Sequence, residues 1–135
     1  MKKLIFLISF LFLSMTSFSQ LNQKLNEKYF ESIFANAIDG EMEVKLTDKS
    51  RVDIVTDTFA IEVEFAKKWA ESIGQSLYYA YVLEKKPGIV LIIEKESDNN
   101  FLKRLLVVTT KQNITVWLLD ARTKKWKKIT KNNYY

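Results

Sequence analysis

The sequence predicts a single α/β domain built on a mixed β-sheet, with the element order α-β-β-β-α-β-α-β. Segments with helical periodicity alternate with short strand-like segments along the chain. The 135 residues are 47% hydrophobic, with three glycines and one proline, which suits one folded domain and excludes a disordered or fibrous chain. Helices separate the last strands, so parallel crossovers are expected there after an initial hairpin region.

The first nineteen residues are predicted to be a secretory signal peptide. Lys2 and Lys3 form a basic start, residues 4–13 are almost entirely apolar, and residues 17–19 offer small side chains for cleavage. A membrane anchor is the alternative, but the apolar run is shorter than the roughly 20 residues of a span. We therefore expect no stable membrane anchor, and a domain at residues 20–135 that is exported to a bacterial periplasm or secreted.

The N-terminal half of this domain is predicted to hold one helix followed by three strands. Residues 21–38 carry apolar side chains at helical spacing, and Asp39 and Gly40 end this helix, with the glycine in a left-handed position. The three strands are expected at residues 42–46, 51–55 and 59–65. Only residues 56–58 separate the last two, which therefore form a tight hairpin.

The C-terminal half is predicted to alternate helices and strands. These elements are expected as a helix at 66–81, a strand at 89–93, a helix at 101–110 and a strand at 114–119. Lys-Lys-Pro-Gly at 85–88 breaks the chain before a strand that is apolar throughout and is therefore buried on both faces. Residues 121–135 form a basic tail around Trp126, which either follows a nucleic-acid backbone or is a solvated chain end.

The composition restricts the chemistry that the chain can perform. It has no cysteine and no histidine, which excludes disulfides, cysteine nucleophiles, histidine-dependent triads and His-ligated zinc. Carboxylate oxygens instead suit hard cations such as Mg²⁺ or Mn²⁺. Without the first nineteen residues the net charge is +3, which does not by itself imply a nucleic-acid partner.

Carboxylates face one another across the predicted hairpin. If the chain turns at residues 57–58, Asp53 lies directly opposite Glu62, and Arg51 lies directly opposite Glu64, all on one face. Like charges directly opposite each other are destabilising, and carboxylates this close must share a proton or a cation. A divalent metal would resolve the conflict.

The other face of the hairpin is predicted to belong to the core. Its side chains are those of Val52, Ile54, Ile61, Val63 and Phe65. The alternative to a metal site is an ordinary hairpin in which Arg51 and Lys67 neutralise a solvent-facing acidic surface.

The helix after the hairpin carries a polar stripe at helical spacing. The stripe consists of Lys68, Ser72, Gln75 and Tyr79. The N-terminal amides of this helix attract anions such as phosphate, and they follow directly on the strand that carries Glu62 and Glu64. Lys67 and Lys68 oppose the helix dipole in the first turn, which is consistent with a functional role for them. Taken alone, Gln75 and Tyr79 fit a solvated helix face.

Taken together, Asp53, Ile-Glu-Val-Glu at 61–64 and Gln-Ser-Leu-Tyr-Tyr at 75–79 resemble the motifs of the PD-(D/E)xK nuclease superfamily. The most similar pattern is that of its RecB-like branch, which has a Q-xxx-Y motif on the helix after the catalytic hairpin. The resemblance covers roughly residues 27–93 and implies a restriction-endonuclease-like core.

The resemblance also implies a metal site. Asp53 and Glu62 would bind Mg²⁺ or Mn²⁺ together with the backbone carbonyl of Val63. An acidic residue of the first helix would complete the set, with Glu31 preferred over Glu27. The reaction would be metal-assisted hydrolysis of phosphodiester bonds in DNA outside the cytoplasm.

The remaining roles implied by the resemblance depend on one departure from the superfamily pattern. Gln75 and Tyr79 would contact the substrate or brace the site. Glu64 stands where the superfamily has lysine, so Lys67 or Lys68 would supply the missing cation, or Glu64 would act as a base or further ligand. The alternatives are a catalytically inactive nuclease-fold binding protein of the bacterial envelope, and an unrelated envelope protein whose carboxylate pair is incidental.

Overall fold

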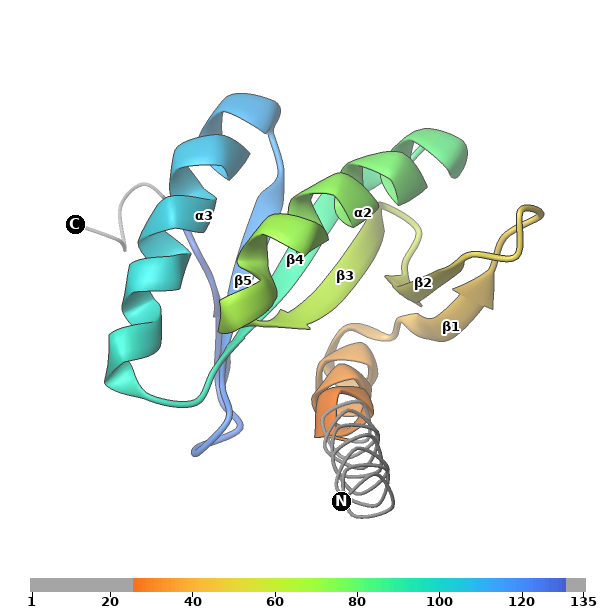
Figure 1. The fold of residues 1–135 in the computed structure, drawn as a ribbon. Helices are drawn as coiled ribbons and strands as arrows, with labels where there is room; N and C mark the ends of the chain where they lie inside the picture. Colours follow the sequence, from red (N-terminus) through yellow and green to blue (C-terminus); the bar gives the residue numbers. More distant parts are fainter. Residues whose placement is uncertain (1–25, 131–135) are drawn as a thin grey trace, which may run out of the picture.

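The computed structural model describes residues 26–130. Within this range, six strands form one mixed sheet in the order β1-β2-β3-β4-β5-β6, and three helices pack on it (Figure 1). The first three strands are antiparallel, β3 to β5 are parallel, and β6 is antiparallel to β5. The α/β class and the mixed sheet expected from the sequence are confirmed. The predicted signal peptide, residues 1–19, lies outside the described residues.

The elements follow the expected succession with shifted ends. The strands are β1 (Glu41–Lys45), β2 (Arg51–Val55), β3 (Phe59–Phe65), β4 (Lys86–Ile93), β5 (Thr115–Asp120) and β6 (Trp126–Lys128). The helices are the N-terminal helix at residues 26–38 of the described range, α2 (Trp69–Val82) and α3 (Asn99–Gln112), and 3₁₀ turns at Ala66–Lys68 and Glu96–Asp98 precede the last two. Within residues 26–130, no helix combines the length and hydropathy needed to cross a bilayer.

Helices cover both faces of the sheet. Phe30 and Phe34 of the N-terminal helix pack on one face, while α2 and α3 lie together over the other (Figure 1). Side chains of β4 alternate between these two cores, Val90 facing the first and Ile89 and Leu91 the second. The continuous apolar run in β4 therefore reflects burial on both faces, as predicted.

Two predicted boundaries in the C-terminal half are wrong. β4 begins at Lys86, so it includes the Pro-Gly pair that was expected only to break the chain. A Cβ at Gly88 would lie 2.8 Å from the Trp117 ring and 3.0 Å from Ile61, so this strand position requires glycine for close packing. The basic tail also contains β6, an edge strand that pairs with β5 through its backbone.

The N-terminal helix ends at residue 38 as predicted, but the left-handed residue that follows it differs from the prediction. Asp39, and not Gly40, adopts the left-handed conformation, with φ of 55°. Gly40 serves a packing purpose instead, because a Cβ there would lie 2.5 Å from Ile54 Cγ2 on β2. The glycine allows the chain leaving the helix to pass directly against the sheet, and this brings the helix close to β1 and β2.

Candidate metal centre

The β2–β3 hairpin has the register predicted from the sequence near its turn. Val55 pairs with Ala60 and Ile54 with Ile61, and the Thr56 N–H donates to the Phe59 carbonyl at 2.9 Å. Both pairs have residue numbers that sum to 115, as expected for a turn centred on residues 57–58. The turn therefore directs the next residue of β2, Asp53, towards Glu62.

Beyond Ile54 the regular pairing of β2 with β3 gives way to a side-chain contact. The Val63 N–H donates to Asp53 Oδ2 at 2.8 Å, so a carboxylate takes the place of a backbone carbonyl in the ladder. The faces of β2 change at the same point: Ile54 packs with the N-terminal helix, whereas Val52 packs with Tyr79 of α2. The prediction that Val52 shares the core face of Ile54 is therefore wrong.

Arg51 does not lie beside Glu64 as the extended register predicts. Its Cα partner is Lys45 of β1, and its guanidinium forms an ion pair with Glu43, which also lies on β1. Because the pairing with β3 ends before Arg51, the side chain turns to β1. The predicted Arg51–Glu64 pairing is corrected accordingly.

Glu43 is the acidic residue that the sequence analysis missed. One carboxylate oxygen from each of Glu31, Glu43 and Asp53 lies within 4.8 Å of the other two, and the three residues come from the N-terminal helix, β1 and β2. In the structure Met42 pairs with Ile54, so the next residue of β1 falls opposite Asp53. The predicted strand ends, residues 46 and 51, would instead have placed Glu43 opposite Ile54, so the sequence alone did not point to Glu43.

Glu62 of β3 extends this cluster through Asp53, with which it forms a side-chain hydrogen bond. Its side chain is 4% exposed and its Oε1 has no hydrogen-bond partner among the described residues. Glu31, 2% exposed, likewise has a buried Oε1 without a partner. Buried carboxylate oxygens are normally paired, so these two atoms mark the cluster as incomplete without a proton or a cation.

Burial raises the pKa values of the cluster. Desolvation, followed by the charges of Asp53 and Glu43, raises the pKa of Glu31 to about 8. Desolvation and the neighbouring Asp53 also raise the pKa of Glu62, and desolvation raises that of Asp53 against the hydrogen bond from Val63. Without a cation, the folded protein therefore holds protons on Glu31 and Glu62 at neutral pH.

Glu64 lies at the edge of the cluster. It is 7% exposed, and its Oε1 accepts the N–H of Phe65 at 3.0 Å. Desolvation and the nearby Glu27 raise its pKa, while the charge of Lys68 lowers it. Lys68 is therefore the predicted lysine that the structure brings to Glu64; Lys67 is exposed and makes no described contact with the carboxylates.

The predicted residues of α2 lie beside the cluster. Tyr79 is buried, and desolvation together with the charge of Glu62 raises the pKa of its hydroxyl, while a hydrogen bond with Gln75 lowers it. Gln75 itself is exposed at the surface of α2. The structure thus brings Tyr79 to the carboxylates of the β2–β3 hairpin, whereas Gln75 contacts Tyr79 and no described carboxylate.

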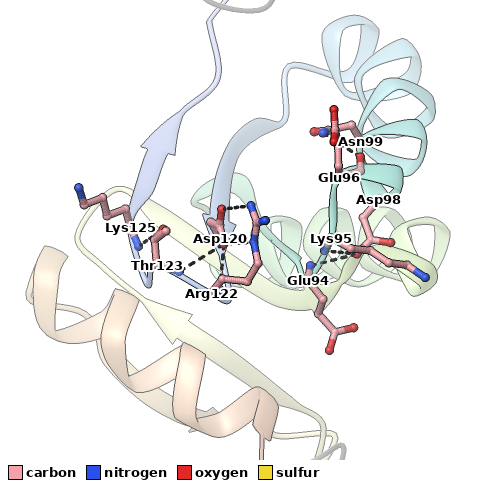
Figure 2. A network of polar contacts seen from close by, with 9 residues as sticks. All are labelled: Glu94, Lys95, Glu96, Asp98, Asn99, Asp120, Arg122, Thr123 and Lys125. Atoms are coloured by element: carbon pink, nitrogen blue, oxygen red, sulfur yellow. Dashed lines mark hydrogen bonds and ion pairs between the residues drawn. The ribbon is translucent and has the colours of Figure 1, made fainter.

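A second polar network at the carboxyl ends of β4 and β5 has a different character (Figure 2). Asp98 Oδ2 accepts the N–H groups of Glu94 and Lys95, and Arg122 binds both carboxylate oxygens of Asp120. The hydrogen bonds from Arg122 lower the pKa of Asp120 to about 2. Three of these four carboxylate oxygens already have donors, and Asp98 Oδ1 is the one among them that is buried without a partner in the described residues. The network therefore holds the loops in place and is a poorer candidate for a cation.

The comparisons with known proteins do not assign the chain to a family. No protein-family model and no solved structure matches it. The chain is similar to a curated protein of Acanthamoeba polyphaga mimivirus, named putative KilA-N domain-containing protein R878, with 26% identity over 100 residues. This match covers 74% of the chain but 27% of the viral protein. The class established here is that of an α/β protein with a buried carboxylate cluster at one side of a mixed sheet.

Proposed function

We propose that the chain is a divalent-metal-dependent nuclease with a restriction-endonuclease-like core, which hydrolyses phosphodiester bonds of DNA. One observation carries this proposal: the partnerless buried oxygens of Glu31 and Glu62 lie in a cluster with Asp53. A proton would satisfy each oxygen singly, but a divalent cation satisfies the whole cluster at once. The succession of helix, three antiparallel strands, helix and parallel strand supports the proposed core.

In this proposal, Asp53, Glu62 and Glu31 hold Mg²⁺ or Mn²⁺. The bound cation supplies a more acidic water and stabilises negative charge that develops on the phosphate. The Val63 N–H donates to Asp53 Oδ2 at 2.8 Å and holds this carboxylate in place. A rigid first ligand of this kind limits the rearrangement needed when the cation binds.

Other side chains have roles around this site. Glu64, in place of the lysine of the superfamily pattern, is proposed to accept a proton from the attacking water, and its raised pKa suits that role near neutral pH. Lys68 supplies positive charge next to it, Gln75 and Tyr79 bind or brace the substrate, and Lys67 contacts the phosphate backbone from the surface.

The partner in this proposal is DNA, encountered outside the cytoplasm if residues 1–19 direct export. The basic segment around β6 supports a polyanionic partner. Lys124 lies over the ring of Tyr29, and the Trp126 ring packs at 5.0 Å from that of Phe34, so both are anchored to the helix that carries Glu31. Trp126 is 37% exposed and can still stack on a base.

Nicking of supercoiled plasmid tests the proposed activity. We expect the purified protein to nick plasmid in Mg²⁺ or Mn²⁺ and not in EDTA. Glu62→Gln should abolish nicking, because an amide is a poor ligand for a hard cation. Asp57→Asn, in the exposed turn of the same hairpin, is the matched control and should keep the activity.

A different result would favour the alternative function. If the wild-type protein nicks DNA in neither metal but binds Mn²⁺ in calorimetry, the nuclease proposal fails and a non-catalytic binding protein of the same fold replaces it. The observation that favours this non-catalytic function is Glu64, which stands in the position of the superfamily's lysine.

A further inference from the structure

Glu43 lies outside every motif quoted from the sequence, yet its carboxylate lies between a group of carboxylates and two cationic side chains. On one side are the carboxylates of Glu31 and Asp53, each with an oxygen within 4.8 Å of one of Glu43. On the other side Lys28 Nζ lies 3.2 Å from Glu43 Oε2, and Arg51 binds the same oxygen. Glu43 is thus the one of these three carboxylates that ion-pairs directly with cationic side chains in the described residues.

The two cations leave the rest of the cluster uncompensated. Both contact Oε2 of Glu43, whereas Oε1 of Glu31, within the same group of carboxylates, is buried and has no partner. Their own side chains are 43% and 52% exposed. Ion pairs with this much exposure are weak, so a divalent cation can displace Lys28 and Arg51 from the carboxylate.

The backbone at Glu43 directs its side chain to this position. Its φ of 56° lies in the left-handed region, in the middle of β1 and between the regular pairs made by Met42 and Val44. A glutamate adopts this conformation only where the surroundings impose it. Irregular strand positions beside functional sites commonly redirect one side chain.

We propose that Glu43 is a ligand of the divalent cation held by Glu31 and Asp53, and that Lys28 and Arg51 exchange with this cation and then bind a phosphate group of the nucleic acid. The inference rests on the proposed function and names two further parts of the same site. Lys28 and Arg51 would then supply positive charge for the substrate in a site where Glu64 replaces the expected lysine. The exchange breaks only the ion pairs of Glu43 with Lys28 and Arg51. The two side chains then form ion pairs with a phosphate group of the substrate.

Calorimetric titration with Mn²⁺, in the absence of nucleic acid, tests the first part. We expect Glu43→Gln to weaken Mn²⁺ binding by about tenfold or more, because even residues that only support a ligand contribute that much. Glu41→Gln, exposed on the same strand, is the matched control and should bind as the wild type does. Arg51→Gln should bind Mn²⁺ several-fold more tightly, since it removes a competing cation.

The second part is tested with thymidine 5′-monophosphate, which carries a phosphate group but no phosphodiester bond. Arg51→Gln saturated with Mn²⁺ should bind this nucleotide several-fold more weakly than the wild type. The opposite effects of one substitution on metal and nucleotide would not arise from a merely structural ion pair. If Glu43→Gln fails to fold, the Arg51→Gln measurements decide the proposal.

The outcomes separate this inference from the proposed function. Mn²⁺ binding that is lost in Asp53→Asn but unchanged in Glu43→Gln and Arg51→Gln would overturn the inference and leave the proposed metal site intact. A wild-type protein that binds no Mn²⁺ would overturn both.

Discussion

Glu62 is a buried acid whose neutral form suits the protein better than its charged form. Desolvation and the adjacent Asp53 raise its pKa, and its Oε1 has no hydrogen-bond partner among the described residues. In the absence of metal the side chain therefore carries a proton at pH 7. A glutamine has nearly the same shape as this protonated acid, which allows the structural and ligating roles of the residue to be separated.

We expect Glu62→Gln to leave the free energy of unfolding at pH 7 in EDTA within about 0.5 kcal/mol of the wild type. The same variant should lose most of the stabilisation that Mn²⁺ gives the wild type, because stabilisation by a ligand scales with its affinity for the folded state. Thermal unfolding with and without Mn²⁺ measures both. Glu94→Gln, exposed after β4, is the control. A large loss of stability in EDTA would show that the carboxylate itself holds the fold together.

At the residue scale, the site could be predicted where it depends on local pairing. Asp53 and Glu62 follow from a short turn, and the turn has the expected register. Glu31 required the resemblance, because nothing in its own segment points across to the hairpin. Glu43 and its ion pair with Arg51 were missed, because they depend on the β1–β2 register and on the left-handed backbone of Glu43. A glutamate in the sequence does not predict a left-handed conformation.

At the scale of elements, glycines in β4 and α2 have opposite surroundings. A Cβ at Gly88 would meet the Trp117 ring at 2.8 Å and Ile61 at 3.0 Å, both belonging to the buried core. A Cβ at Gly74, in the middle of α2, would meet nothing within 4 Å. The same substitution should therefore destabilise one element and stabilise the other.

We expect Gly88→Ala to lower the free energy of unfolding by about 1–3 kcal/mol, the usual effect of overpacking a core. Gly74→Ala should raise it by about 0.5–1 kcal/mol, because alanine loses less backbone entropy in a helix. Urea unfolding of the two variants beside the wild type measures both changes. Equal effects of the two substitutions would contradict the packing of β4 against β5 described above.

The elements that sequence patterns found are those whose periodicity reflects burial. The alternation in β3 places Ile61 and Val63 in the core beside the N-terminal helix, and the apolar run of β4 is packed against helices on both faces. β6 could not be found in this way, because its three residues are exposed and it forms through backbone pairing with the edge of β5. The left-handed residue after the N-terminal helix was misassigned, because Gly40 is required by contact with Ile54 and not by its own φ.

At the scale of the whole molecule, the carboxylate cluster links folding to pH and to metal. The pKa of Glu31 is raised from 4.5 to about 8, and those of Asp53, Glu62 and Glu64 are raised in the same direction, chiefly by burial. Above pH 4.5 the unfolded chain releases these protons while the folded protein keeps them. Because the folded state then binds more protons, raising the pH favours unfolding. Asp120, with a pKa lowered to about 2, acts only at lower pH and does not obscure this window.

Stability in EDTA should therefore fall as the pH rises from about 5 to about 8, the range in which the unfolded chain has released the proton of Glu31 and the folded protein still holds it. Saturating Mn²⁺ or Ca²⁺ should abolish this fall, because the metal-bound folded protein has these carboxylates deprotonated, as the unfolded chain has, and the two states then bind equal numbers of protons. Thermal unfolding across this pH range, with and without metal, measures both slopes. Glu31→Gln should flatten the fall in EDTA, whereas Glu94→Gln should not. Stability in EDTA that rises with pH over the same range would mean that the carboxylates are already neutralised within the fold, and the reason for a metal at this site would be lost.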